Sequence, residues 1–385
     1  MAQIDKLFIQ NFKSLHDIEL EMRPLNILIG ANGSGKSNLI QFFEMMSEAA
    51  DGNLETFIRE RIGIEELLWK GDDTYHSLIE VRFKNELNKS INADYGYRVV
   101  LRIRNYRVSI EEESLHSKEK TYLLTNDRMA KITDDENEVM IPFNDYYDQS
   151  ELFVSQFRDP TRFQFLNVAR VQLRDWSVYG ALGQKQFDAI YMARPLEPSF
   201  PLKLDHEYKR FVSVLYAFAN EARYESAQEE LDYVLSSAFP DFKKLDIRNM
   251  AAGRVALYWR TKQGWQIPAS SLSDGILRFL GLAVLLLLPD PPPLIAIDEP
   301  EIGLHPRLLP LLAALMKDAS KRTQLIVTTH SPQLINAESI EVDDVVVTHM
   351  EEGATHFERL KADELKLWLE RYTLGNLWMM GKLES

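Results

Sequence analysis

Residues 30–37 read Gly-Ala-Asn-Gly-Ser-Gly-Lys-Ser, which is a complete G-x-x-x-x-G-K-[ST] phosphate-loop motif. The apolar run at 25–29 predicts a buried strand before the motif, and residues 36–50 after it have apolar residues at helical spacing. The glycines let successive backbone N–H groups face one point, and the helix adds the positive end of its dipole. Strand, loop and helix in this order therefore predict a site for a nucleoside triphosphate.

Two residues at the end of the loop carry the predicted contacts. Lys36 is expected to reach the β- and γ-phosphates, and the hydroxyl of Ser37 is expected to bind Mg²⁺. The sequence thus predicts ATP and Mg²⁺ as the bound groups. The predicted nucleotide-binding residues of this stretch are Asn32, Gly33, Ser34, Gly35, Lys36, Ser37 and Asn38.

The composition describes an ordinary globular chain. It has 385 residues, 45% of them hydrophobic, and no cysteine. The absence of cysteine excludes disulfides, thiolate zinc sites and a cysteine nucleophile, and it fits a reducing compartment. Residues 1–7 do not resemble a signal peptide, and the apolar run between Arg278 and Pro289 is too short to span a bilayer. We therefore expect a cytoplasmic protein without a membrane partner.

The net charge of −14 does not favour attraction of the whole molecule to nucleic acid. Local basic stripes remain compatible with it, and Arg98, Arg102, Arg104 and Arg107 alternate along a predicted hairpin. Such a row is more typical of a solvated sheet face than of a DNA groove. DNA contact at this row is kept as the alternative.

The pattern along the chain predicts an α/β fold with an insertion. Residues 51–150 alternate apolar and polar over several runs, which predicts an inserted β-rich lobe. Residues 1–50 and 151–385 are predicted to form the nucleotide-binding head, with a helical subdomain at about 200–288. The short apolar runs 294–297 and 325–327 predict strands of a mixed or parallel central sheet that is covered on both faces.

Two predicted strands end in residues that suit phosphate chemistry. Asp298 and Glu299 follow the run 294–297, where the first acid can hold Mg²⁺ and the second can orient or deprotonate the attacking water. His330 follows the run 325–327 and can hydrogen-bond a γ-phosphate or that water. We predict Glu299, His330 and Lys36 as catalytic residues, and Ser37 and Asp298 as metal ligands.

Residues 272–275, Leu-Ser-Asp-Gly, precede the apolar helix predicted at 274–288. Ser273 or Asp274 can simply cap that helix. Alternatively, the serine and the glycine at a helix N-terminus can bind a γ-phosphate. The local sequence leaves both interpretations open.

The order of these motifs resembles ABC-type ATPase heads of the SMC, RecF and OLD-like group. Within that group the chain is most similar to stand-alone ATPases of the AAA15/AAA21 type, which have no TOPRIM domain. The resemblance spans the chain and is densest at 1–48 and 270–335. It rests on Phe12-Lys13-Ser14-Leu15, residues 30–38, Leu272 to Leu280, Ile297 to Pro300, Gly303 to Pro306, Thr329 to Pro332 and Tyr372 to Trp378.

The resemblance implies a role for each motif. Leu272 to Gly275 corresponds to the ABC signature, in which Ser273 and Gly275 would contact ATP bound by a second copy. Lys13 joins the predicted nucleotide-binding residues, and Gly303-Leu304-His305 resembles the D-loop. Gln156 resembles the Q-loop glutamine and is our predicted third metal ligand, although Gln164 and Gln172 lie nearby.

Three features depart from the relatives. The signature reads Leu-Ser-Asp-Gly-Ile, so that Asp274 puts a carboxylate near the partner's phosphates unless it points away. The long coiled coil of SMC proteins is absent. Only 55 residues follow His330, too few for the TOPRIM nuclease of the OLD group, so we do not expect this chain to cut DNA by itself.

The leading functional hypothesis is an ATP-hydrolysing switch. Two heads would pair on ATP as a homodimer or higher homo-oligomer and act in DNA maintenance or bacterial anti-phage defence with a separate effector, a nuclease or a toxin. The first alternative is a nucleotide-gated scaffold whose hydrolysis is incidental, with the amphipathic helix predicted at 363–372 as its docking surface. The second is the motor subunit of a transporter, which the residues around Lys13 and Asp298 disfavour.

Overall fold

The structure is a computed structural model of the chain. It describes residues 3–71, 75–84, 94–126, 128–133, 138–143, 147–157, 163–191, 194–197, 202–250 and 253–383.

The central sheet has six strands in the order β10-β15-β16-β3-β17-β18. The first five are parallel and β18 pairs antiparallel with β17. All five residues of β3 and of β16 are buried, as expected for strands covered on both faces. The bounds are β3 Leu25–Ile29, β10 Ser177–Tyr179, β15 Leu294–Asp298, β16 Gln324–Thr328, β17 Val345–Glu351 and β18 Ala354–Arg359.

A second sheet is antiparallel and has eight strands in the order β2-β1-β4-β5-β6-β7-β8-β9. Strand β1 pairs with β2 on one side and with β4 on the other, so the strands of 51–150 continue the sheet that the N-terminus begins. The limits of an inserted lobe at 51–150 stay a prediction. The bounds are β1 Gln3–Phe12, β2 Leu15–Glu21, β4 His76–Lys84, β5 Tyr95–Arg104, β6 Arg107–Ser117, β7 Thr121–Thr125, β8 Met129–Thr133 and β9 Glu138–Pro142.

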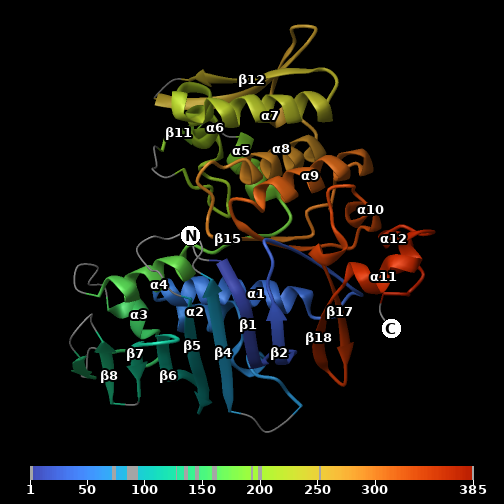
Figure 1. The fold of residues 1–385 in the computed structure, drawn as a ribbon. Helices are drawn as coiled ribbons and strands as arrows, with labels where there is room; N and C mark the ends of the chain where they lie inside the picture. The colour runs from blue at the N-terminus through green and yellow to red at the C-terminus, as the bar shows by residue number, and fades with distance from the viewer. Residues whose placement is uncertain are drawn as a thin grey trace.

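Helix α1 (Lys36–Asp51) packs in one core with the antiparallel sheet and one face of the central sheet. Leu28, Ala296 and Ile326 point into this core from neighbouring strands. The short helices beside it are α2 Leu54–Phe57, the π-helical turn Ile58–Ile62, α3 Phe153–Gln156 and α4 Gln164–Arg174. Figure 1 shows this layer as the lower half of the molecule.

The opposite face of the central sheet carries Ile27, Ile297 and Val327 into a second core, formed with the helical region. Its helices are α5 Gln184–Tyr191, α6 Phe211–Asn220, α7 Glu225–Ala238, α8 Asp274–Leu286, α9 Leu309–Ala319 and α10 Pro332–Ile335. A small antiparallel sheet lies beyond α6 and α7 at the upper end of Figure 1. Its strands are β11 Arg194–Pro195, β12 Phe242–Asn249, β13 Arg254–Thr261 and β14 Gln266–Pro268.

The chain ends in helices α11 (Ala362–Leu369) and α12 (Leu374–Met379). Leu365, Leu369 and Trp378 pack against the second core, which is the structural role that the amphipathic pattern most often has. Among the described residues, no helix has the length and apolar character needed to cross a bilayer.

Candidate nucleotide site

Three parallel strands bring the predicted site residues to one edge of the central sheet. Strand β16 lies between β3 and β15, with Thr328 beside Leu28 on one side and beside Asp298 on the other. Neighbouring strands are about 4.8 Å apart, so the ends of β3 and β15 are separated by roughly 10 Å. The phosphate loop, the acid pair and His330 each follow one of these three carboxyl ends, which is the usual edge for ligands in parallel sheets.

The phosphate loop requires glycine at the positions where other segments approach it. Gly30 has φ +149°, and a Cβ there would lie 2.0 Å from the carbonyl oxygen of Thr348. Gly35 has φ +101°, and a Cβ there would lie 1.9 Å from Thr355 Oγ1. Gly35 also precedes α1 without any side-chain cap, which leaves the first N–H groups of the helix available to an anion.

Lys36 lies inside the loop with its ammonium group against the backbone. Its Nζ donates to the carbonyl oxygens of Gly30 and Ala31, both at 2.9 Å, and lies 3.4 Å from Ser34 Oγ. The side chain is buried, whereas Ser37, one residue on, is exposed on the first turn of α1. A buried cation enclosed by a glycine cradle suits a triphosphate, and the adjacent hydroxyl suits Mg²⁺.

The turn between β1 and β2 packs on the start of α1. Asn38 Nδ2 donates to Ser14 Oγ at 2.7 Å, and Ser14 Oγ lies 2.6 Å from Thr355 Oγ1. Lys13 has φ +52° and donates to Gln41 Oε1 at 2.7 Å. Burial lowers the pKa of Lys13. Lys13 and Asn38 thus lie at the N-terminal half of α1, and their role in binding the nucleotide stays a prediction.

Thr328 connects the two acids at the end of β15. Its hydroxyl donates to Asp298 Oδ1 and accepts the backbone N–H of Glu299 at 3.0 Å. Glu299 has φ +48°, a left-handed conformation that is uncommon for a residue with a Cβ. Strain of this kind persists where the surroundings hold it, and it concentrates at functional sites.

Glu299 and His330 face each other at the sheet edge. Glu299 Oε1 lies 3.3 Å from His330 Nε2, and each side chain is about one third exposed. The backbone N–H of His330 donates to Glu301 Oε1 at 2.7 Å. The sequence did not predict that Glu301 holds the backbone of His330, because Asp298 and Glu299 already supplied the two acids that the predicted chemistry needs.

Ser273 and Gly275 lie at the N-terminus of α8. Ser273 is exposed and caps the helix, its Oγ accepting the N–H of Ile276 at 3.4 Å. A Cβ on Gly275 would lie 3.0 Å from the carbonyl oxygen of Gly303, so the segments 272–275 and 303–305 touch within one chain. His305 caps the turn that follows, accepting the N–H of Arg307 at 3.2 Å. Capping by Ser273 is therefore observed, and it leaves the serine on the surface.

The structure does not bring Gln156 to the other predicted metal ligands. Gln156 Oε1 accepts the backbone N–H of Asp148 at 2.9 Å, and Gln156 Nε2 donates to the carbonyl oxygen of Asp148 at 2.8 Å. The same turn carries Glu151, which accepts the N–H groups of Leu54 and Glu55 just beyond the C-terminus of α1. Helix α1 is roughly 24 Å long and Ser37 lies at its other end, so the placement speaks against a metal role for Gln156.

The strand that runs beside β15 on its free side is β10, and sequence analysis did not predict it. The residues that follow β10 line a cavity of about 550 Å³ together with Asp298; they include Gly180 and Gln186. Gln186 Oε1 accepts the N–H of Gly183 at 3.1 Å. Gln186 is therefore a glutamine that shares a cavity with Asp298, whereas Gln156 does not line it.

The arginine row of the antiparallel sheet is partly neutralised. Arg98 lies 3.7 Å from Glu112, and Arg102 lies 3.1 Å from Glu111. Ion pairing across the strands fits the solvated sheet face more than a DNA groove.

A family model described as "AAA domain, putative AbiEii toxin, Type IV TA system" (AAA_21) matches residues 25–336. No curated protein matches the chain. Among solved structures, an SMC head bound to the C-winged helix domain of ScpA is similar with TM-score 0.60 and 15% identity, over 95% of this chain and 99% of that one. The SMC head domain of Thermotoga maritima is similar with TM-score 0.51 and 16% identity, over 93% of this chain and 99% of that one.

A third similar structure is the SMC head of Pyrococcus furiosus with an extended coiled coil, bound to the C-terminal domain of ScpA. Its TM-score is 0.58 and its identity 13%, over 96% of this chain and 99% of that one. Likeness at these identities concerns the fold alone. It bears out the α/β fold of an ABC-type head with a mixed central sheet.

Proposed function

The chain belongs to the AAA_21 family of AAA domains, and we propose that it is an ATPase that binds ATP with Mg²⁺, hydrolyses it and pairs head to head while ATP is bound. One observation carries this proposal. The strand order β15-β16-β3 gathers the phosphate loop, Asp298, Glu299 and His330 at a single edge of the sheet.

Each residue at that edge has a task in phosphoryl transfer to water. Lys36 would hold the β- and γ-phosphates, and the oxygens of Ser37 and Asp298 would hold Mg²⁺, which would neutralise charge on the phosphates. Glu299 orients the attacking water and accepts its proton. His330, 3.3 Å from Glu299, holds the γ-phosphate or the same water. Catalysis then consists of positioning and of charge stabilisation.

Pairing of two heads would complete each site. Ser273 and Gly275 lie at the start of α8, and Ser273 is exposed, so a second copy can present them to ATP held by the first loop. A symmetric pair of this kind encloses two nucleotides, and hydrolysis releases it.

The family description, which names a putative toxin and a type IV toxin–antitoxin system, supports a role in a system of that kind, and anti-phage defence is the biological setting that we propose for it. We propose that the head acts there as a switch for a separate effector, since two of the similar SMC heads are described as bound to a partner protein, ScpA.

Two substitutions test the site. Lys36→Ala should abolish binding of a fluorescent ATP analogue, whereas Lys321→Ala, in the exposed turn after α9, should leave binding unchanged. Glu299→Gln should retain ATP binding and lower the release of phosphate by about a hundredfold or more. Unchanged nucleotide affinity in Lys36→Ala would refute the assignment. If Glu299→Gln loses turnover but keeps full biological activity, the chain is a nucleotide-gated scaffold and not a hydrolytic switch.

A further inference from the structure

The small sheet at the upper end of the molecule has one covered face and one open face. Val255, Leu257 and Trp259 point inward from β13 and are buried against the second core, which includes α6 and α7. The alternate residues of β13 and their cross-strand neighbours therefore lie on the other face. In Figure 1, β12 lies beyond α6 and α7 at the outer end of the molecule. The outward positions are Lys244, Asp246, Arg248, Arg254, Ala256, Tyr258, Arg260 and Gln266.

This face is basic although the protein is acidic. The outward positions carry four lysines and arginines and one aspartate, in a chain of net charge −14. The four are Lys244, Arg248, Arg254 and Arg260. Positive charge concentrated on a single face is typical of a surface that binds phosphate backbones.

Specific contacts hold the cationic side chains of the open face in place. Asp246 pairs with Lys244 at 2.9 Å and with Arg260 Nε at 2.8 Å, so one acid holds two cations in place. Arg248 lies over the ring of Tyr258, 4.7 Å from its centroid, and bonds Gln266. Arg254 is exposed at the start of β13. After Asp246 is counted, the outward face keeps a net positive charge.

Aromatic and apolar side chains lie on this face and at its edges. Tyr258 lies in the middle of the face, half-buried and with Arg248 over its ring. Trp265, in the turn that leads into β14 at the edge of the sheet, is 72% exposed, and Met250, just beyond β12, is 45% exposed. The ring of Trp265 and the guanidinium plane of Arg248 on Tyr258 offer stacking surfaces to unpaired bases, whereas the stacked bases of a duplex cannot reach them.

We propose that the outer face of β11–β14 binds single-stranded nucleic acid, through phosphates on the arginines and lysines and through base stacking on the Arg248–Tyr258 pair and on Trp265 at the edge of the sheet. The proposal goes beyond the ATPase function and does not depend on it, because none of these residues belongs to the nucleotide site. It also places the basic surface on the helical region and not on the arginine row of the antiparallel sheet.

The test is fluorescence anisotropy with labelled 20-nucleotide oligo-dT, oligo-rU and a DNA duplex of the same length. The wild type should bind the single strands more tightly than the duplex, and the tighter of the two single strands identifies the natural class. Arg248→Ala/Arg254→Ala should weaken single-strand binding at least tenfold and reduce the slope of log K against log salt by about 1.4. Trp265→Ala should weaken binding by roughly tenfold.

Arg102→Ala/Arg107→Ala is the matched control, since it removes two arginines from the other hairpin, and it should bind like the wild type. Thermal melting followed by circular dichroism establishes that each variant is folded. Lys36→Ala should also bind like the wild type, which separates this surface from the nucleotide site. Equal affinities for duplex and single strands, or unchanged binding in the folded Arg248→Ala/Arg254→Ala variant, would overturn the proposal.

Discussion

At the scale of single residues, a buried carboxylate makes the stability of the protein depend on pH. Glu113 accepts hydrogen bonds from Tyr97 Oη and from the N–H groups of Phe153 and Val154, without a cation among these partners. Burial raises the pKa of Glu113 to about 7. The folded state therefore binds a proton between about pH 4.5 and 7 that the unfolded state has released, and stability falls as the pH rises through this window.

Glu113→Gln should remove that dependence. Relative to the variant, the wild type should lose roughly 3 kcal/mol of unfolding free energy between pH 4.5 and 8, because only the wild type must bury an ionised group at high pH. Urea unfolding at a series of pH values measures the difference, with Glu119→Gln at an exposed turn as the control. Parallel stability profiles for wild type and Glu113→Gln would contradict the prediction.

The candidate site residues could be predicted individually where a motif defines them. The phosphate loop fixes Lys36 and Ser37, and two acids after an apolar strand suggest Asp298 and Glu299. Glu301 and Gln186 could not be found in the same way, because their roles follow from the position of the strand ends. Gln156 was chosen from its sequence context, whereas its amide in fact holds the turn at 148–152.

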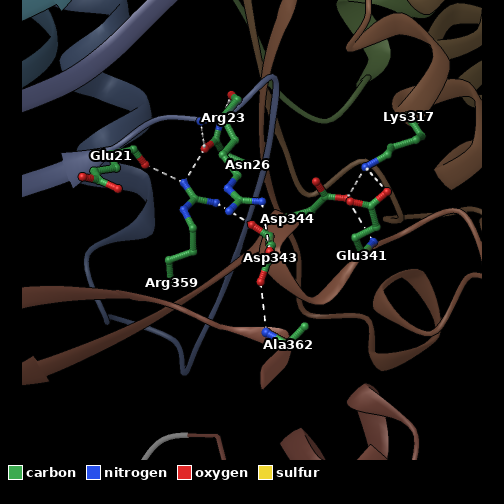
Figure 2. A network of polar contacts seen from close by, with 9 residues as sticks. All are labelled: Glu21, Arg23, Asn26, Lys317, Glu341, Asp343, Asp344, Arg359 and Ala362. Carbon is green, nitrogen blue, oxygen red and sulfur yellow. Dashed lines mark hydrogen bonds and ion pairs between the residues drawn. The ribbon is translucent and has the colours of Figure 1, made fainter. Parts of the chain in front are cut away.

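At the scale of elements, a polar network joins β17 and β18 to the N-terminal strands at the edge opposite the nucleotide site. Figure 2 shows Arg359 donating to the carbonyl oxygen of Glu21, to Asn26 Oδ1 and to the carbonyl oxygen of Asp343, at 2.7, 2.6 and 3.0 Å. Burial, together with the nearby charge of Arg23, lowers the pKa of Arg359 to about 10. Arg359 thus connects the C-terminal hairpin to β2 and β3.

Arg359→Met should destabilise the protein by about 2–3 kcal/mol, because it removes the donor from two partly buried acceptors, Asn26 Oδ1 and the carbonyl oxygen of Asp343, and from the exposed carbonyl oxygen of Glu21. Arg23→Met should cost less than about 1 kcal/mol, because the pair of Arg23 with Asp343 is more exposed and its loss relieves repulsion with Arg359. Chemical unfolding of the two variants measures the difference. A smaller effect for Arg359→Met than for Arg23→Met would count against the network.

Among the elements, periodicity predicted those that are long or wholly apolar. The runs 25–29, 294–297 and 325–327 are buried strands, and the alternation after residue 76 is an antiparallel sheet. Strand β10 has only three residues, too few to show a period, and it became recognisable only through its pairing with β15. The pairing of β1 with β4 joins distant segments, which no local pattern reveals.

At the scale of the whole molecule, the central sheet is the common wall of two cores. Leu28 and Ile326 face the core of α1 and the antiparallel sheet, while Ile27 and Val327, their neighbours in sequence, face the helical region. The candidate site residues lie where these strands end, so a ligand bound at this edge would contact elements anchored in both cores. Gly303, shortly after the acid pair, touches Gly275 at the start of α8 and extends this connection to the exposed Ser273.

The exposed position of Ser273 leads to a prediction about assembly. Ser273→Arg places a large cation where a second copy would meet the bound triphosphate, without disturbing a buried contact in the monomer. The Glu299→Gln variant should trap ATP, and light scattering should show that it is a dimer with ATP. The double variant Glu299→Gln/Ser273→Arg should be a monomer and should bind ATP with the same affinity. Ser236→Arg, on the exposed side of α7, is the matched control and should still pair. Dimers of Ser273→Arg with ATP would mean that the copies meet through another surface, and the signature segment would then have no role in a neighbour's site.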